Sequence, residues 1–88
     1  MSFNMLKAVN RAHQTTLNKL YKVDRQYNAL VDAGDMLDGT VGIRKWEAHE
    51  AKQEACYEAL IDLWVSLPKR EQTNANKQYE AIYGYTII

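Results

Sequence analysis

The chain has 88 residues, of which 47% are hydrophobic and 25% are charged, and its formal net charge at pH 7 is zero. A chain of this length forms one small domain and buries only about 60–65% of the surface of its unfolded form, so its core is thin. This composition is that of a globular rather than a disordered protein, and the balanced charge argues against a strongly basic nucleic-acid binder.

The first element that the sequence predicts is a long amphipathic helix over about residues 3–32. Its seam residues recur at alternating steps of three and four, which is the pattern of a helix that packs along its length against another helix. The seam consists of Leu6, Val9, His13, Thr16, Leu20, Val23, Tyr27 and Leu30. This part of the chain is basic, with five basic against two acidic side chains in residues 1–32.

Residues 33–41 are predicted to form the connection that follows, and they are rich in Asp and Gly. A calcium loop of the EF-hand type needs several oxygen ligands at fixed spacing around a glycine. With Gly39 in the glycine position, only Asp38 fits, so the pattern fails. We therefore expect a structural hinge, in which Gly34 ends the first helix and Asp38 or Thr40 caps the second.

A second amphipathic helix is predicted over about residues 42–67, again with steps of three and four. Its seam consists of Ile43, Trp46, Glu50, Gln53, Tyr57, Leu60, Trp64 and Leu67. Residues 33–67 are acidic, with seven acidic against three basic side chains. Two helices of matching length and opposite charge should fold back as an antiparallel hairpin, with Tyr27 beside Trp46 in the predicted layers.

The end of the second helix is apolar in nearly every direction, so a further element has to cover it. Pro68 should end this helix, and a shorter third helix is predicted over about residues 69–83 with Gly84 as its C-terminal cap. The apolar tail, residues 84–88, should dock on the core or enter a neighbouring chain. The predicted fold is thus all-α, an antiparallel helical hairpin with a third C-terminal helix, in a single domain spanning residues 1–88.

Catalytic and metal sites are poorly supported by the sequence. His13, His49 and Cys56 are the strong soft-metal ligands, and the predicted hairpin keeps the two histidines far apart, whereas zinc usually takes three or four ligands. No serine has an evident His and Asp arrangement, and no phosphate-binding loop is present. We therefore expect a protein that is not an enzyme and that needs no metal or cofactor.

Two charged stripes are candidate binding surfaces. One sector of the first predicted helix, opposite its seam, is basic and contains Lys7, Arg11, Lys22 and Arg25. This basic stripe could bind the phosphates of a nucleic acid or a nucleotide, or it could bind an acidic partner protein. That acidic partner could be another copy, through the stripe formed by Glu47, Glu54 and Glu58. Because the net charge is zero and the basic stripe has no aromatic residue, we favour the interpretation that both stripes are ordinary solvent-exposed helix faces.

The aromatic C-terminal segment is the preferred interface, because aromatic side chains are enriched where proteins bind each other. The expected partner-binding residues are Leu63, Val65, Tyr79, Ile82, Tyr83, Tyr85, Ile87 and Ile88. We expect the protein to be cytoplasmic, because its single cysteine, Cys56, favours a reducing compartment. We do not expect it to span a membrane, because its most apolar window is too short to cross a bilayer.

We therefore expect a non-catalytic helical protein that binds another protein, as an adaptor or inhibitor, and that self-associates. By analogy only, small proteins that phages and mobile elements direct against host factors have this profile, and such a protein would act in the host cytoplasm. The alternatives are a nucleic-acid or nucleotide phosphate binder that uses the basic stripe, and a structural subunit of a larger assembly.

Overall fold

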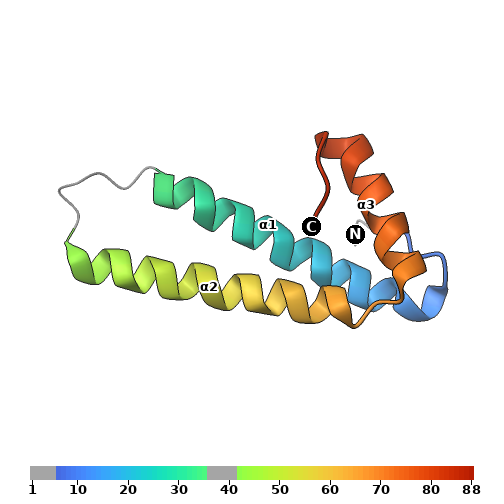
Figure 1. The fold of residues 1–88 in the computed structure, drawn as a ribbon, viewed down its shortest axis with the longest axis horizontal. Helices are drawn as coiled ribbons and strands as arrows, with labels where there is room; N and C mark the ends of the chain where they lie inside the picture. The colour runs from blue at the N-terminus through green and yellow to red at the C-terminus, as the bar shows by residue number, and fades with distance from the viewer. Residues whose placement is uncertain (1–5, 36–41) are drawn as a thin grey trace.

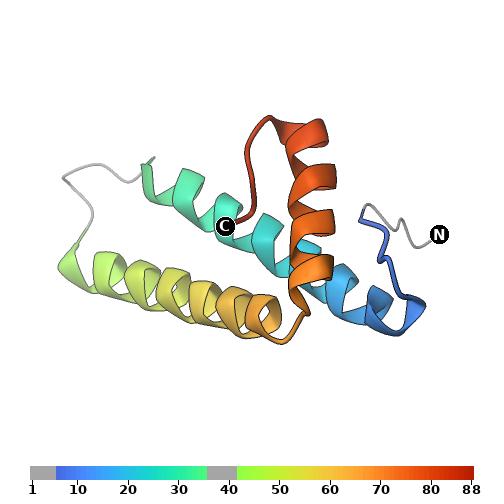
Figure 2. The same ribbon diagram turned by 45° about the vertical axis from the view of Figure 1, so that its right-hand side comes forward.

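The protein is elongated and helical, with principal dimensions of 48 × 26 × 23 Å. The computed structural model describes residues 6–35 and 42–88. In chain order, the elements are a short 3₁₀ helix η1 (Arg11–His13) and the α-helices α1 (Gln14–Asp35), α2 (Ile43–Val65) and α3 (Lys69–Tyr83). α1 and α2 lie antiparallel as a hairpin, and α3 stands across α1 at the end away from the connection (Figures 1 and 2). The predicted all-α fold is confirmed.

The first helix begins later than the heptad pattern predicts. α1 starts at Gln14, directly after η1, and residues 6–10 form an irregular segment instead of continuing the helix. Asn10 caps the intervening η1, because its side-chain oxygen accepts a hydrogen bond from the backbone N–H of Ala12 at 3.0 Å. The predicted helix was therefore wrong over residues 6–10, and its first residues, 3–5, lie outside the described ones.

The helix ends at the connection also differ from the prediction. Gly34 lies inside α1 rather than beyond it, and α2 begins after Gly42, which contributes no side-chain cap. The proposed caps Asp38 and Thr40 lie outside the described residues. At the other end of the molecule, Gly84 caps α3 in the left-handed conformation, with φ of 81°, as predicted.

The seam of α2 follows a different face from the predicted one. A series of buried and half-buried positions runs along it in steps of three and four: Trp46, His49, Gln53, Cys56, Leu60, Leu63 and Leu67. Glu50 and Tyr57, which the prediction placed in the seam, are exposed instead. The predicted and the observed series share every second position, so the spacing alone could not distinguish the two faces.

The register of the hairpin is displaced as well. Tyr27 packs against Tyr57, with 5.4 Å between ring centroids, and not against Trp46. The partner of Tyr27 thus lies about three helical turns further along α2 than predicted. The predicted alignment paired the two seams from end to end. In the structure, α2 extends beyond α1 at the connection end (Figure 1).

The core lies where α3 meets the hairpin. Its buried residues are Leu6, Leu17, Leu20, Leu60, Leu67, Ala75 and Tyr79. The apolar end of α2 is covered there, as expected, with Leu63 and Trp64 packed against this cluster. The half of the hairpin nearest the connection contributes none of these buried residues, so among residues 6–35 and 42–88 the well-packed end of the molecule is the one that contains α3.

Candidate functional site

The structure divides the expected partner-binding residues into two groups. Tyr79 is fully buried, and Leu63, Tyr83 and Ile87 pack against the core. The exposed members are Val65, Ile82, Tyr85 and Ile88. Half of the set is therefore engaged within this chain, and the eight residues do not form one free surface.

The C-terminal tail docks on α3 of its own chain, which is one of the two expected alternatives. The backbone N–H of Ile87 donates to Oδ1 of Asn76 at 2.9 Å, and Nδ2 of Asn76 donates to the backbone oxygen of Ile88 at 3.4 Å. The ring of Tyr85 packs near those of Tyr79 and Tyr83, with centroid distances of 5.6 and 6.1 Å. Tail and aromatic rings together form a small cluster over the middle of α1.

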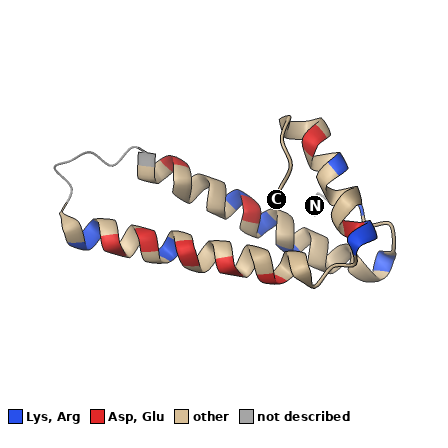
Figure 3. Cartoon of the chain, viewed as in Figure 1, with Lys and Arg blue, Asp and Glu red and all other residues tan. Residues whose placement is uncertain are grey.

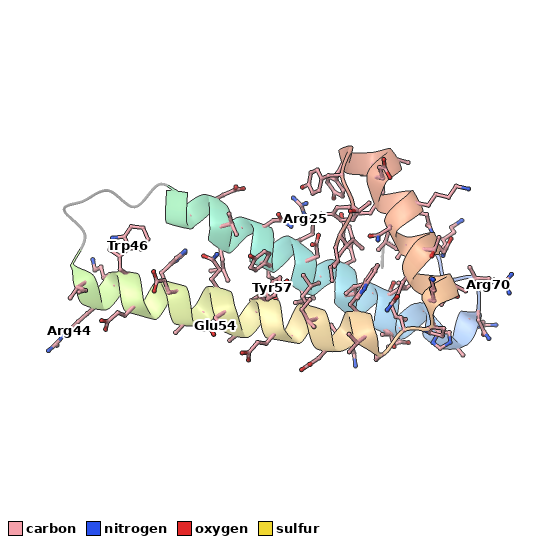
Figure 4. The ribbon with its side chains drawn as sticks, viewed as in Figure 1. Arg25, Arg44, Trp46, Glu54, Tyr57 and Arg70 are labelled. Carbon is pink, nitrogen blue, oxygen red and sulfur yellow. The ribbon has the colours of Figure 1, made fainter. Side chains whose placement is uncertain are left out.

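The expected basic stripe does not form as one helical face. Lys7 lies in the irregular segment and Arg11 in η1, so neither shares α1 with Lys22. The guanidinium of Arg25 lies 4.6 Å from the centroid of the Tyr83 ring, and it donates a hydrogen bond to the hydroxyl of Tyr79 at 3.4 Å. Arg25 thus serves the contact between α1 and α3, as its position in Figure 4 shows.

The amide-rich sequence of α3 fixes the N-terminal segment by hydrogen bonds to its backbone. Gln78 holds Lys7 on both sides, since its Oε1 accepts from the N–H of Lys7 and its Nε2 donates to the oxygen of Lys7, each at 2.8 Å. Asn74 donates to the same oxygen at 2.7 Å. On the other edge, Oε1 of Gln14 accepts from the N–H of Ala8 at 2.9 Å. These bonds replace the helical ones that the prediction assigned to this segment.

Glu71 completes this set and is itself buried, with 2% of its surface exposed. One carboxylate oxygen accepts from the backbone N–H of Asn10 at 2.8 Å, and the other accepts from that of Val9 at 3.2 Å. Glu71, Asn74 and Gln78 follow each other at steps of three and four along α3. This regular spacing of polar side chains is visible in the sequence and indicates a polar contact face on α3. Apolar periodicity, on which the prediction depended, does not detect it.

A buried acid links α1 to α3. Asp24 is 3% exposed, and its Oδ2 accepts a hydrogen bond from the hydroxyl of Tyr79 at 2.5 Å. Burial raises the pKa of the Asp24 carboxyl above its ordinary value, and the hydrogen bond from Tyr79 and the charge of Arg25 act in the opposite direction. Neither Asp24 nor Tyr79 lines the two hollows described below, so this pair is a structural link and not a substrate site.

A groove between α1 and α2 is the best-formed candidate binding site. It lies in the half of the hairpin nearest the connection and has a volume of about 400 Å³. Its lining includes three aromatic residues, two acids and a histidine: Tyr27, Trp46, Tyr57, Glu50, Glu54 and His49. Trp46 and Tyr57 point from α2 toward α1 (Figure 4). All of its lining residues belong to α1 and α2, and α3 lies at the other end of the hairpin (Figure 1).

A second hollow lies on the other side of the hairpin and is less suited to specific binding. Gln26, Ala29, Leu30, Lys52 and Cys56 line it, and its volume is about 460 Å³. It contains no aromatic residue. The thiol of Cys56 donates to the backbone oxygen of Val23 at 3.5 Å, and burial raises the pKa of this thiol, which makes it a poor nucleophile.

Gly34 of α1 and His49 of α2 are in close contact at this end of the hairpin. A Cβ atom on Gly34 would lie 2.8 Å from Nε2 of His49. That nitrogen is buried and has no hydrogen-bond partner among the described residues. The absence of a side chain at Gly34 therefore allows α1 to pack on the imidazole of His49. Gly34 does not mark the end of the helix, as the sequence had indicated.

The substitution Gly34→Ala tests this contact. We expect it to lower the free energy of unfolding by about 1 kcal/mol, because the added methyl group has to displace the imidazole of His49. In a His49→Ala background the same change should be neutral or stabilising, since Ala favours a helix by up to about 1 kcal/mol over Gly. Urea denaturation of the four proteins gives the coupling between the two sites. Equal effects in both backgrounds would show that the contact carries no strain.

Neither a metal-ligand cluster nor a membrane-spanning helix is found in the described ranges, 6–35 and 42–88. No group of three or more His, Cys, Asp or Glu side chains there could hold a metal ion. Among the helices of these ranges, none combines the length and the apolar character that a membrane crossing needs. No protein-family model, curated protein or solved structure matches this chain.

Proposed function

We propose that this protein acts by binding another protein, without catalysis, at the groove in the connection half of the hairpin. The observation that carries this proposal is the aromatic lining of the groove, which α3 does not cover because it lies at the opposite end of the hairpin (Figure 1). Tyr57 lines the groove and has 45% of its surface exposed, and Ile43, which is 74% exposed, lies about one helical turn before the lining residue Trp46. Exposed apolar side chains that gather around a hollow are typical of sites where proteins bind each other.

This proposal moves the interface away from the C-terminal segment. The buried Tyr79 and the half-buried Tyr83 and Ile87 are held within the chain, so they have less surface to offer a partner. Phosphate binding by the basic residues has less support than protein binding, because Arg25 is engaged with Tyr83. An adaptor or an inhibitor would both use a surface of this kind, and the choice between them depends on the partner.

The experiment compares two double variants that each remove exposed apolar surface. Ile43→Ala with Tyr57→Ala alters the flank of the groove, and Ile82→Ala with Tyr85→Ala alters the C-terminal surface. A protein captured by the wild-type chain from its source cells is identified and purified, and its Kd is measured with all three forms. Circular dichroism confirms that each variant is folded.

We expect the groove variant to weaken the affinity at least about tenfold, which corresponds to about 1.4 kcal/mol, because aromatic residues dominate interface energies. The C-terminal variant should bind like the wild type. The opposite pattern would place the interface on the C-terminal segment and overturn the proposal. Light scattering on the same samples tests the expected self-association.

A further inference from the structure

We propose that the groove takes an amphipathic helix of a partner protein, with Lys or Arg residues beside its apolar stripe. This inference rests on the proposed function and names the class of partner. It follows from three properties of the groove: its position relative to α3, the sign of its charge and the state of His49.

The position of the groove is that of a missing third helix. On α1, Asp24 contacts α3 through Tyr79, and Val31 lines the groove. These two residues are two helical turns apart on one face of α1, so the groove continues the face that α3 covers further along. From Trp46 to Tyr57 it is about 16 Å long, which suits a helix of about three turns.

The charge of the groove is negative. Glu50 and Glu54 line it, and no Lys or Arg is among its lining residues. Glu47 and Glu58 are exposed on the adjoining turns of α2, where Figure 3 shows a row of acidic residues. A partner helix that fits the aromatic floor therefore gains affinity and orientation from basic residues along its edges.

His49 adds a polar requirement inside the groove. Its Nε2 is buried without a hydrogen-bond partner among the described residues, and its side chain lies between Gly34 and the groove. A buried polar nitrogen of this kind is usually satisfied in the functional state. Because Nε2 faces Gly34 in this structure, the imidazole has to turn toward the groove for a hydrogen-bonding side chain of the bound helix to supply that partner.

A second copy of this chain fits the groove poorly. In a symmetric dimer the same patch meets itself, which would bring Glu50 and Glu54 of one protomer against the same carboxylates of the other. Like charges at close range disfavour such a pairing. The charge therefore points to a different protein as the occupant.

Three labelled synthetic peptides test the inference by fluorescence anisotropy. Each is about 18 residues long, enough for a marginally stable helix. The first has an apolar stripe flanked by Lys and Arg, the second has the same stripe flanked by Glu, and the third has the composition of the first with its apolar positions scrambled. The protein variants are Glu50→Gln with Glu54→Gln in the groove and, as a control with the same charge change, Asp62→Asn with Glu80→Gln.

We expect the basic amphipathic peptide to bind at least about tenfold more tightly than either other peptide, and more weakly as salt is added. The groove variant should remove most of that preference, and the control variant should retain it. Equal binding of the basic and acidic peptides, equal binding of the scrambled peptide, or no binding of any peptide would overturn the inference.

The failure of this inference is distinguishable from failure of the proposed function. A captured partner whose affinity depends on Ile43 and Tyr57, together with peptides that do not bind, would retain the groove and reject the basic helix. Light scattering could also detect a dimer that becomes more stable in Glu50→Gln with Glu54→Gln. Such a dimer would identify a second copy as the occupant and would also reject the inference.

Discussion

Replacing Glu71 with Ala is expected to lower the free energy of unfolding by about 3 kcal/mol. Its carboxylate accepts hydrogen bonds from the backbone N–H groups of Val9 and Asn10, and bonds to a charged group contribute about 1.5–3 kcal/mol each. Water can reach part of this exposed segment after the change, which keeps the loss below the sum. Urea denaturation followed by circular dichroism measures the difference.

Two companion variants make the Glu71 result specific. Glu71→Gln retains one acceptor oxygen, so about half of the loss is expected. Glu80→Ala removes an exposed carboxylate from the same helix, and a surface change of this kind should stay within about 0.5 kcal/mol of the wild type. If Glu71→Ala behaves like Glu80→Ala, then the N-terminal segment does not depend on α3 in solution.

The Glu71 contacts also explain why the start of the first helix could not be predicted. Leu6 and Val9 continue the heptad pattern of α1, so periodicity assigns them to the helix. The competing hydrogen bonds come from side chains more than sixty residues later in the chain, such as Glu71 to Asn10, and local spacing holds no information about them. Leu6 is buried, as expected, but it belongs to an irregular segment and not to a helix.

The three helices and their ends near Pro68 and Gly84 could be predicted, because proline and glycine act locally and the apolar spacing is strong. The register could not be predicted, because heptad positions repeat and several alignments satisfy the same spacing. The candidate site depended on that register. An alignment that places Glu50 and Tyr57 in the seam predicts no groove, whereas the observed alignment leaves both residues beside a hollow.

Replacing Tyr79 with Phe is expected to cost about 2–3 kcal/mol at neutral pH, because the buried carboxylate of Asp24 loses the hydroxyl that donates to it. Burial raises the pKa of Tyr79, so this hydroxyl stays protonated and can donate throughout the neutral range. Tyr57→Phe is the matched control. The Tyr57 ring is partly exposed, and loss of its hydroxyl should change stability by less than about 0.5 kcal/mol.

The pH dependence identifies Asp24 as the source of this loss. The pKa of Asp24 is raised in the folded state, chiefly by burial, so between the ordinary value of 3.8 and the folded value the folded protein binds more protons than the unfolded chain. Stability contributed by this group therefore falls as pH rises through that window and is constant above it. Tyr79→Phe raises the pKa of Asp24 further, which widens the window and deepens the fall.

The deficit of Tyr79→Phe relative to the wild type should thus grow from about 1 kcal/mol at pH 3, where only a neutral hydrogen bond is lost, to its full value near pH 7. Asp24→Asn keeps an oxygen that accepts from Tyr79 and cannot ionise, so it should flatten this part of the profile and be at least as stable as the wild type at pH 7. Urea denaturation at a series of pH values measures all three proteins. A deficit independent of pH would show that Tyr79 acts through packing, and that the link between α1 and α3 does not depend on the charge of Asp24.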